Sequence, residues 1–194
     1  MILINVLVLI GFLYLSKSQN LFMPNLSLGE YRTVFNRVHP CELTKNQTFQ
    51  FNGYFSKKSA NVTELKGNIT LWKSLDDSYT LEVNIASWSL TGGWKPNSYV
   101  YITKNACSKM KFVLGNTWVS LMKAFNFPND SCPMPAGTYI SSGLDVKKLE
   151  DHNFPKVYFY GKYKIVYMIK NVENKMVGCI AFEMNLIRPW EKPI

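Results

Sequence analysis

The sequence predicts an all-β domain, an immunoglobulin-like β-sandwich or cup with one short helical excursion and two disulfides. Three observations support this fold class. Apolar and polar residues alternate along several segments, one segment alone has helical spacing, and four cysteines are spread along the chain. A period of two gives a strand one apolar face, and a sheet with one apolar face buries that face against another layer.

The first 18 residues are typical of a secretory signal peptide. The apolar run from Met1 to Leu15 is shorter than the roughly 18 to 20 residues that cross a bilayer. Small residues at Ser16 and Ser18 suit cleavage by a signal peptidase. We therefore expect a signal peptide over residues 1–18, and an uncleaved membrane anchor is the alternative.

Five N-glycosylation sequons agree with a secretory route. Any one of them could arise by chance, so the signal lies in their number and in their agreement with the leader. The acceptor residues are Asn25, Asn46, Asn61, Asn68 and Asn129. We expect a secreted glycoprotein that resides outside the cell, in the lysosome or in another endomembrane lumen.

Residues 19–194 predict a single domain, because the segment is long enough for a sizeable core and contains no linker or internal repeat. The formal net charge of the chain is +9, and its basic residues are scattered rather than clustered. Scattered charge on a secreted glycoprotein argues against a nucleic-acid partner. It fits anionic lipid head groups or an acidic partner better.

The strands expected along the chain each have one apolar face. In residues 64–72, the side chains of Leu65 and Ile69 face one way and that of Asn68 faces the other, so a glycan on Asn68 would point outward. The apolar faces of the other strands contain Phe49, Phe51 and Phe55; Tyr79, Leu81, Val83 and Ile85; and Met176, Ile180, Phe182, Met184 and Leu186.

Residues 107–125 break this alternation, because their apolar residues recur at helical spacing. We expect a helix that packs on a sheet, with Gly115 and Asn116 as the point of interruption. The residues on its apolar stripe are Val113, Leu114, Trp118, Leu121, Met122 and Phe125.

The four cysteines allow three disulfide pairings in an oxidising compartment. We favour the nested pairing, Cys41 with Cys179 and Cys107 with Cys132. It links the first expected strand to the last one, and it links the two ends of the helical segment to each other. The other two pairings remain open from the residues alone.

Three short segments resemble a known family. They are CPMPAGTY (Cys132 to Tyr139), GKYKI (Gly161 to Ile165) and GCI (Gly178 to Ile180). Their order and spacing are similar to those of the ganglioside-activator branch of the ML-domain, or MD-related lipid-recognition, superfamily, and to related secreted insect proteins of unknown function.

The resemblance implies a β-sandwich cup that holds acyl chains between its sheets. It also implies a bridge between Cys41 and Cys179, because the matching cysteines pair in the ganglioside activators. This chain has only four cysteines where the activators have eight. The missing bridges lie around the helix and the entrance loops. The geometry of the entrance and the identity of the ligand are therefore the features that can least be carried over from the activators to this chain.

We expect no catalytic residues, no metal site and no cofactor. His39 and His152 are in neither a zinc-binding nor a triad-like setting, so we interpret both as surface or turn residues. The chain has no GxSxG, HExxH, P-loop or CxxC motif. Its adjacent acidic pairs, Asp76 with Asp77 and Glu150 with Asp151, are interpreted as solvated turns.

Aromatic residues near turns and element ends predict an apolar mouth that touches a lipid tail or a membrane. The alternative for each of them is that it fills the core. The ligand-binding candidates are Trp88, Trp94, Trp118, Phe125, Phe127 and Tyr158.

We therefore expect a secreted protein that binds a lipid or another hydrophobic small molecule in an apolar cavity between two sheets, for lipid transfer or presentation. The partners expected besides the ligand are a transient contact with a membrane surface and a receptor or hydrolase. Two alternatives are a chemosensory or signalling co-factor that presents its ligand to a receptor, and a secreted interaction protein with no lipid cavity.

Overall fold

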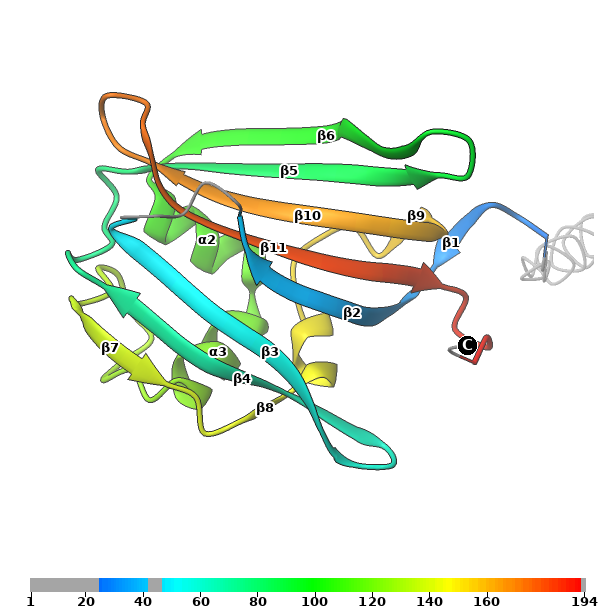
Figure 1. Ribbon diagram of the computed structural model, residues 1–194, viewed down its shortest axis with the longest axis horizontal. Helices are drawn as coiled ribbons and strands as arrows, with labels where there is room; N and C mark the ends of the chain where they lie inside the picture. The colour runs from blue at the N-terminus through cyan, green and yellow to red at the C-terminus, as the bar shows by residue number, and fades with distance from the viewer. Residues whose placement is uncertain (1–24, 42–46, 193–194) are drawn as a thin grey trace, which may run out of the picture.

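The computed structural model describes residues 25–41 and 47–192, so the expected leader and the sequon at Asn46 lie outside the described residues. Within these ranges the strands form a nine-stranded sheet and a two-stranded sheet (Figure 1). The small sheet pairs β1 (Leu28–Glu30) with β9 (Val157–Phe159). The strands of the large sheet are β2 (Arg32–Pro40), β3 (Phe49–Ser59), β4 (Val62–Leu71), β5 (Thr80–Ser89), β6 (Gly93–Lys104), β7 (Gly137–Ile140), β8 (Leu144–Asp145), β10 (Gly161–Lys170) and β11 (Met176–Ile187).

The large sheet divides into two layers. One layer has the order β6-β5-β10-β11, and β2 adds to it by pairing with β11. The other consists of β3 and β4, with β7 and β8 paired to β4. Only the parallel pair of Gly178 and Phe49 links β11 to β3. Because the link lies near one end of both strands, β3 and β4 diverge from β11 in Figure 1, and the two layers form a splayed sandwich. The all-β fold predicted from the sequence is confirmed.

The helical segment lies behind the two layers in Figure 1 and consists of two helices, α2 (Ala106–Leu114) and α3 (Asn116–Ala124). Gly115 separates them with a φ of 55°, in the left-handed region that glycine adopts without steric cost. The interruption predicted at Gly115 is therefore confirmed. A short 3-10 helix, η1 (Val146–Glu150), was not predicted and packs against α3. None of the helices in the described ranges has the length and apolarity needed to cross a bilayer.

Both disulfides of the nested pairing are present. Cys41, which follows β2, is joined to Cys179 in β11, and Cys107 in α2 is joined to Cys132 in the segment before β7. The first bridge spans 138 residues of sequence and the second spans 25. The first links the segment after β2 to β11, and the second links the start of α2 to the segment that follows α3.

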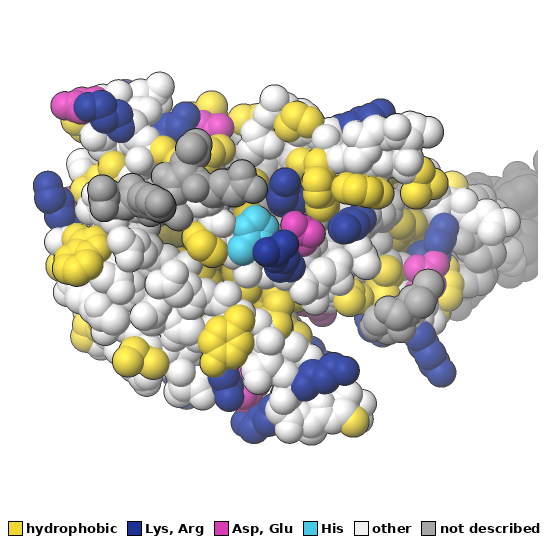
Figure 2. Space-filling model, viewed as in Figure 1, with side chains coloured by type: hydrophobic (Ala, Val, Ile, Leu, Met, Phe, Trp, Pro, Cys, Tyr) yellow, Lys and Arg dark blue, Asp and Glu magenta, His cyan; other side chains and the backbone are white. Residues whose placement is uncertain are grey.

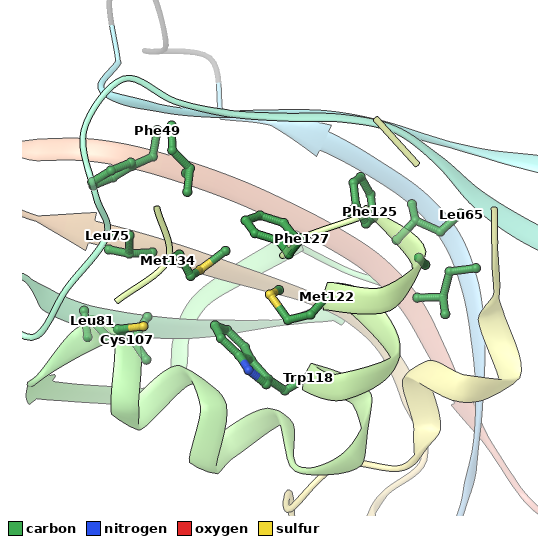
Figure 3. Packing of buried hydrophobic residues seen from close by; sticks show 14 of the residues in the cluster. Phe49, Leu65, Leu75, Leu81, Cys107, Trp118, Met122, Phe125, Phe127 and Met134 are labelled. Atoms are coloured by element: carbon green, nitrogen blue, oxygen red, sulfur yellow. The ribbon is translucent and has the colours of Figure 1, made fainter. Parts of the chain in front are cut away.

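The predicted strand faces are confirmed as well. Leu65, Leu81 and Val83 are buried, and Asn68 lies on the opposite face of β4, where its side-chain oxygen accepts a hydrogen bond from Asn52. Trp118 of α3 and Phe125, the residue that follows α3, extend into the core, with Leu65 of β4 close to Phe125 (Figure 3).

Candidate functional site: an apolar cavity

A cavity of about 470 Å³ lies inside the sandwich. One wall is the inner face of β5, β10 and β11, and the opposite side is made by the two helices together with residues of β3 and β4. The lining is dominated by aliphatic and aromatic side chains. Clefts of roughly 300 to 1,000 Å³ that are mainly apolar are typical of small-molecule sites.

The cavity explains an unusual burial pattern on β10 and β11. Ile165, Tyr167 and Ile169 point inward from β10, and Phe182 points inward from β11, yet all four are only half-buried. In a close-packed sandwich such inner-face residues would have almost no accessible surface. Their accessible surface faces the cavity. Leu65, by contrast, faces the packed core and is 0% exposed.

The cavity opens between β6 and the end of α2. Tyr99 of β6 and Phe112 of α2 both line it and are 49% and 66% exposed, respectively. Residues 152–155 complete the rim. This loop is fixed to α2, because the side-chain amide of Asn153 donates to the carbonyl of Phe112 at 2.6 Å and its backbone N–H donates to the carbonyl of Val113 at 3.0 Å.

His152 lies on this rim. It lies in a bend between η1 and β9, in agreement with its interpretation as a surface or turn residue, and it also lines the cavity. Its ring packs edge-on against Phe154 with centroids 5.0 Å apart, and its Nδ1 accepts from the backbone N–H of Phe154 at 3.3 Å. Burial, followed by the positive charge of Lys156, lowers the pKa of His152 below its ordinary value. The rim is therefore an environment that disfavours the charged imidazolium.

Two of the six predicted ligand-binding residues line the cavity, namely Trp118 and Tyr158. Trp118 is 1% exposed and belongs to the packed wall, where its indole Nε1 donates to the carbonyl of Asp130 at 2.7 Å. Tyr158 lies near the rim and packs edge-on against Tyr163, with ring centroids 5.6 Å apart.

Phe125 and Phe127 do not line the cavity, so the expectation of a mouth role for them is corrected. Phe125 is completely buried against Phe51, and Phe127 is buried and stacks on Tyr139 with centroids 3.7 Å apart. Helical spacing cannot distinguish a residue beside a cavity from a residue one turn further into the core.

Trp88 and Trp94 also lie away from the mouth. They face each other across the β5–β6 hairpin in an edge-to-face pair with centroids 5.2 Å apart. The Nζ of Lys162 lies 4.8 Å from the Trp88 ring and 5.2 Å from the Trp94 ring, and that of Lys164 lies 4.9 Å from the Trp94 ring. These lysines alternate with the cavity-facing Tyr163 and Ile165, so the cluster is on the outer face of the sheet. Figure 2 shows this outer face, and hydrophobic and basic side chains lie next to each other in the region of the β5–β6 hairpin.

Several polar groups of the wall are satisfied within the protein. The Thr117 hydroxyl donates to the carbonyl of Lys148 at 2.9 Å, and the Tyr31 and Tyr163 hydroxyls donate to the carbonyls of Pro155 and Phe159. Burial raises the pKa of both tyrosines. A ligand in the cavity therefore meets mainly apolar atoms and neutral side chains.

The acidic pairs have structural partners. Asp76 accepts from Ser78 within a turn, and Asp77 accepts from the backbone and hydroxyl of Ser108 in the first turn of α2. Glu150 accepts from the backbone N–H of Thr33 at 2.7 Å. Asp151 accepts from the side chain of Asn116. Across the described ranges, no three His, Cys, Asp or Glu side chains form a group that could hold a metal ion.

Several residues of the site were missed by sequence reasoning. Tyr99 and Tyr101 alternate along β6 and both line the cavity, and this alternation is visible in the segment SYVYITK. Phe112 has no comparable signal, because it lies off the apolar stripe of its helix. Tyr167 has no signal in the sequence beyond its place in a strand, β10.

The fold and the cavity together define a class, a disulfide-linked β-sandwich with an internal apolar cavity that opens at one side. Residues 81–165, less than half of the chain, match a family described as "Protein of unknown function (DUF1091)". The matched region contains the β5–β6 hairpin, both helices and the first part of β10. No curated protein matches the chain.

Proposed function

We propose that the protein is a secreted glycoprotein that binds a lipid or another hydrophobic small molecule in this cavity, for transfer or presentation. The observation that carries the proposal is the apolar space of about 470 Å³ between the two layers. Such a role needs no catalytic group, metal or cofactor, and the protein is not proposed to be an enzyme.

The energetics favour an enclosed site for such a ligand. Exposing a 16-carbon acyl chain to water costs about 12 kcal/mol at ~0.8 kcal/mol per methylene, so a carrier must replace nearly all of the apolar contact that a bilayer provides. A surface groove leaves part of the chain in water. In the splayed sandwich, the bound acyl chain would be surrounded by inner-face residues such as Ile165, Ile169 and Phe182, whose accessible surface faces the cavity.

The resemblance to the ML-domain superfamily agrees with this proposal. The resembling segments lie on β7, β10 and β11 and on the loop that carries Cys132. Two of them flank the cavity, since Tyr163 and Ile165 of GKYKI and Gly178, Cys179 and Ile180 of GCI all line it. The proposal extends to a lipid-recognition role within that superfamily and to the single domain over residues 19–194.

A membrane surface is the second partner that we propose. Trp88, Trp94 and the two lysines over their rings combine aromatic and cationic groups, and such side chains settle at the boundary between head groups and acyl chains. The hairpin tip beside them carries Leu90, which is 98% exposed. A brief contact here would bring the protein to its lipid source, and a receptor or hydrolase would accept the ligand.

Cavity filling tests the proposal. Ile165→Trp adds bulk inside the cavity, whereas Val166→Trp adds the same bulk at the next residue of β10, which is not part of the lining. We expect the first variant to lose transfer of a fluorescent lipid between vesicles and the second to retain it, with both folded by circular dichroism. Native mass spectrometry of the protein purified from its source should show a bound lipid.

Two results would favour the alternatives. If no lipid co-purifies and no lipid of a broad panel binds or is transferred, the surface-interaction alternative replaces lipid carriage. If a ligand binds tightly but is not exchanged between vesicles, presentation to a receptor is favoured over transfer.

A further inference from the structure

Tyr167 occupies the centre of the cavity wall. It lies on β10, the middle strand of the layer β6-β5-β10-β11-β2, and pairs with Val83 on one side and Ile180 on the other. Its ring packs edge-on against Phe182 at a centroid distance of 6.2 Å. The side chain is thus surrounded by apolar neighbours on its own layer and faces the cavity.

The hydroxyl of Tyr167 makes no hydrogen bond to any residue in the described ranges. The hydroxyl oxygen is not among the buried atoms without a partner, so it retains accessible surface, and this surface faces the cavity. Tyr31 and Tyr163 line the same cavity, but their hydroxyls already donate to backbone carbonyls at 2.8 and 3.1 Å, respectively. Tyr167 differs from them in having its hydroxyl free.

Burial raises the pKa of Tyr167 well above its usual range, so the side chain keeps its proton and can both donate and accept a hydrogen bond. Buried polar groups in native proteins almost always have a partner. A plain hydrocarbon chain placed against Tyr167 would leave this hydroxyl unpaired, whereas a ligand oxygen at the same place would satisfy it.

The depth of Tyr167 sets where that oxygen must be. Tyr99 marks the mouth on β6, and β10 is two strands away from β6, which corresponds to about 10 Å across the sheet. A polar head group held at the mouth therefore cannot itself be the partner. The partner must lie along the hydrocarbon part of the ligand.

We propose that Tyr167 is a specificity-determining residue that hydrogen-bonds to an oxygen within the hydrocarbon part of the ligand. The ligand class is then a long-chain molecule with a carbonyl or hydroxyl group in mid-chain, rather than an unsubstituted acyl chain. This inference rests on the proposed function, because it assigns a chemistry to the ligand of the same cavity.

The test uses octadecanoic acid and a series of keto-octadecanoic acids with the carbonyl at successive chain positions. Their dissociation constants are measured by displacement of a fluorescent fatty acid from the wild type, Tyr167→Phe and Tyr163→Phe. Tyr163→Phe is the matched control, because it removes a cavity-lining hydroxyl that is already bonded within the protein.

The wild type is expected to bind one keto position, or two adjacent ones, about threefold to tenfold more tightly than octadecanoic acid, the range of one net hydrogen bond. Tyr167→Phe should abolish this preference and bind octadecanoic acid at least as tightly as the wild type does. Tyr163→Phe should keep the preference.

Equal affinity of the wild type for every keto acid and for octadecanoic acid would overturn the inference and leave the proposed function standing. A preference that persists in Tyr167→Phe would also overturn it. Failure of the wild type to bind any of these acids, together with the absence of a co-purifying lipid, would reject both the inference and the proposed function.

Discussion

Trp118 and the pair Trp88–Trp94 were expected at one apolar entrance, but they lie in opposite environments. Trp118 is 1% exposed in the helical wall of the cavity, with its indole nitrogen bonded to Asp130. Trp88 is 43% exposed on the outer face of the β5–β6 hairpin, where it contacts Trp94 and Lys162. Tryptophan content in turn-like segments therefore does not identify a mouth. The neighbours of each ring determine whether it supports the fold or is available to a partner.

The helical wall is held by several connections at once. The bridge from Cys107 to Cys132 and the bond from Trp118 to Asp130 both fasten the helices to the segment 130–132. The outer hairpin contains no disulfide, and it is held by strand pairing within itself and with β10, by side-chain hydrogen bonds such as that between Ser87 and Ser98, and by the lysines over its rings. Changes in the wall should therefore alter stability, and changes in the hairpin should alter surface contacts.

The largest effect is expected for Trp118→Ser. Loss of a fully buried tryptophan leaves a void in the wall and typically costs about 3 to 5 kcal/mol of unfolding free energy. Chemical denaturation of the variant and of the wild type would measure the difference. Trp88→Ser is the control, and an equal loss in the two variants would contradict the contrast drawn between the rings.

Removal of the bridge at the helical wall comes next. The double variant Cys107→Ser, Cys132→Ser opens a loop with a sequence separation of 25 residues, and its expected cost is about 3 kcal/mol in the chain-entropy model. The thermal midpoint of unfolding and the rate of lipid transfer, measured on the same samples, should both decrease, because the wall forms part of the cavity. Unchanged transfer in a folded double variant would show that the bridge does not shape the site.

The hairpin variants Trp88→Ser and Trp94→Ser should change stability by less than about 1 kcal/mol, since partly exposed surface residues contribute little. We expect each to weaken binding to vesicles that contain anionic lipid by severalfold, measured by co-sedimentation. Trp72→Ser is the matched control, because Trp72 is 68% exposed on the other layer. Equal losses in all three variants would indicate a non-specific effect of tryptophan exposure.

The smallest effect concerns pH. The pKa of His152 is lowered in the folded protein, so its neutral form favours folding above the ordinary value of 6.5, and this contribution is lost as the pH falls below that value. The stability of the wild type should therefore decline more steeply between pH 7 and pH 5 than that of His152→Gln. Identical slopes in the two proteins would mean that the imidazole contributes nothing. Lys156 and Asp151, which also act on the pKa of His152, are retained in both.

Some features of this protein follow from local sequence. Alternation along β4 and β5 defines their inner faces, because successive side chains of a strand point to opposite sides. Gly115 ends one helix and begins the next, because its backbone adopts a positive φ. The residues favour the nested disulfide pairing without excluding the other two pairings, and the structure contains the nested one.

Other features were decided by the tertiary structure. Leu65 and Ile165 both face inward on alternating strands, yet Leu65 lies in the packed core and Ile165 lines the cavity. A period of two specifies which side of a sheet a residue faces, but it carries no information on how far the opposite layer is. That distance depends on the single link between Gly178 and Phe49, from which the two layers splay, and on the helices placed behind them. The cavity, its mouth at Phe112 and the position of the Tyr167 hydroxyl at the cavity exist only because segments distant in sequence take up these positions together.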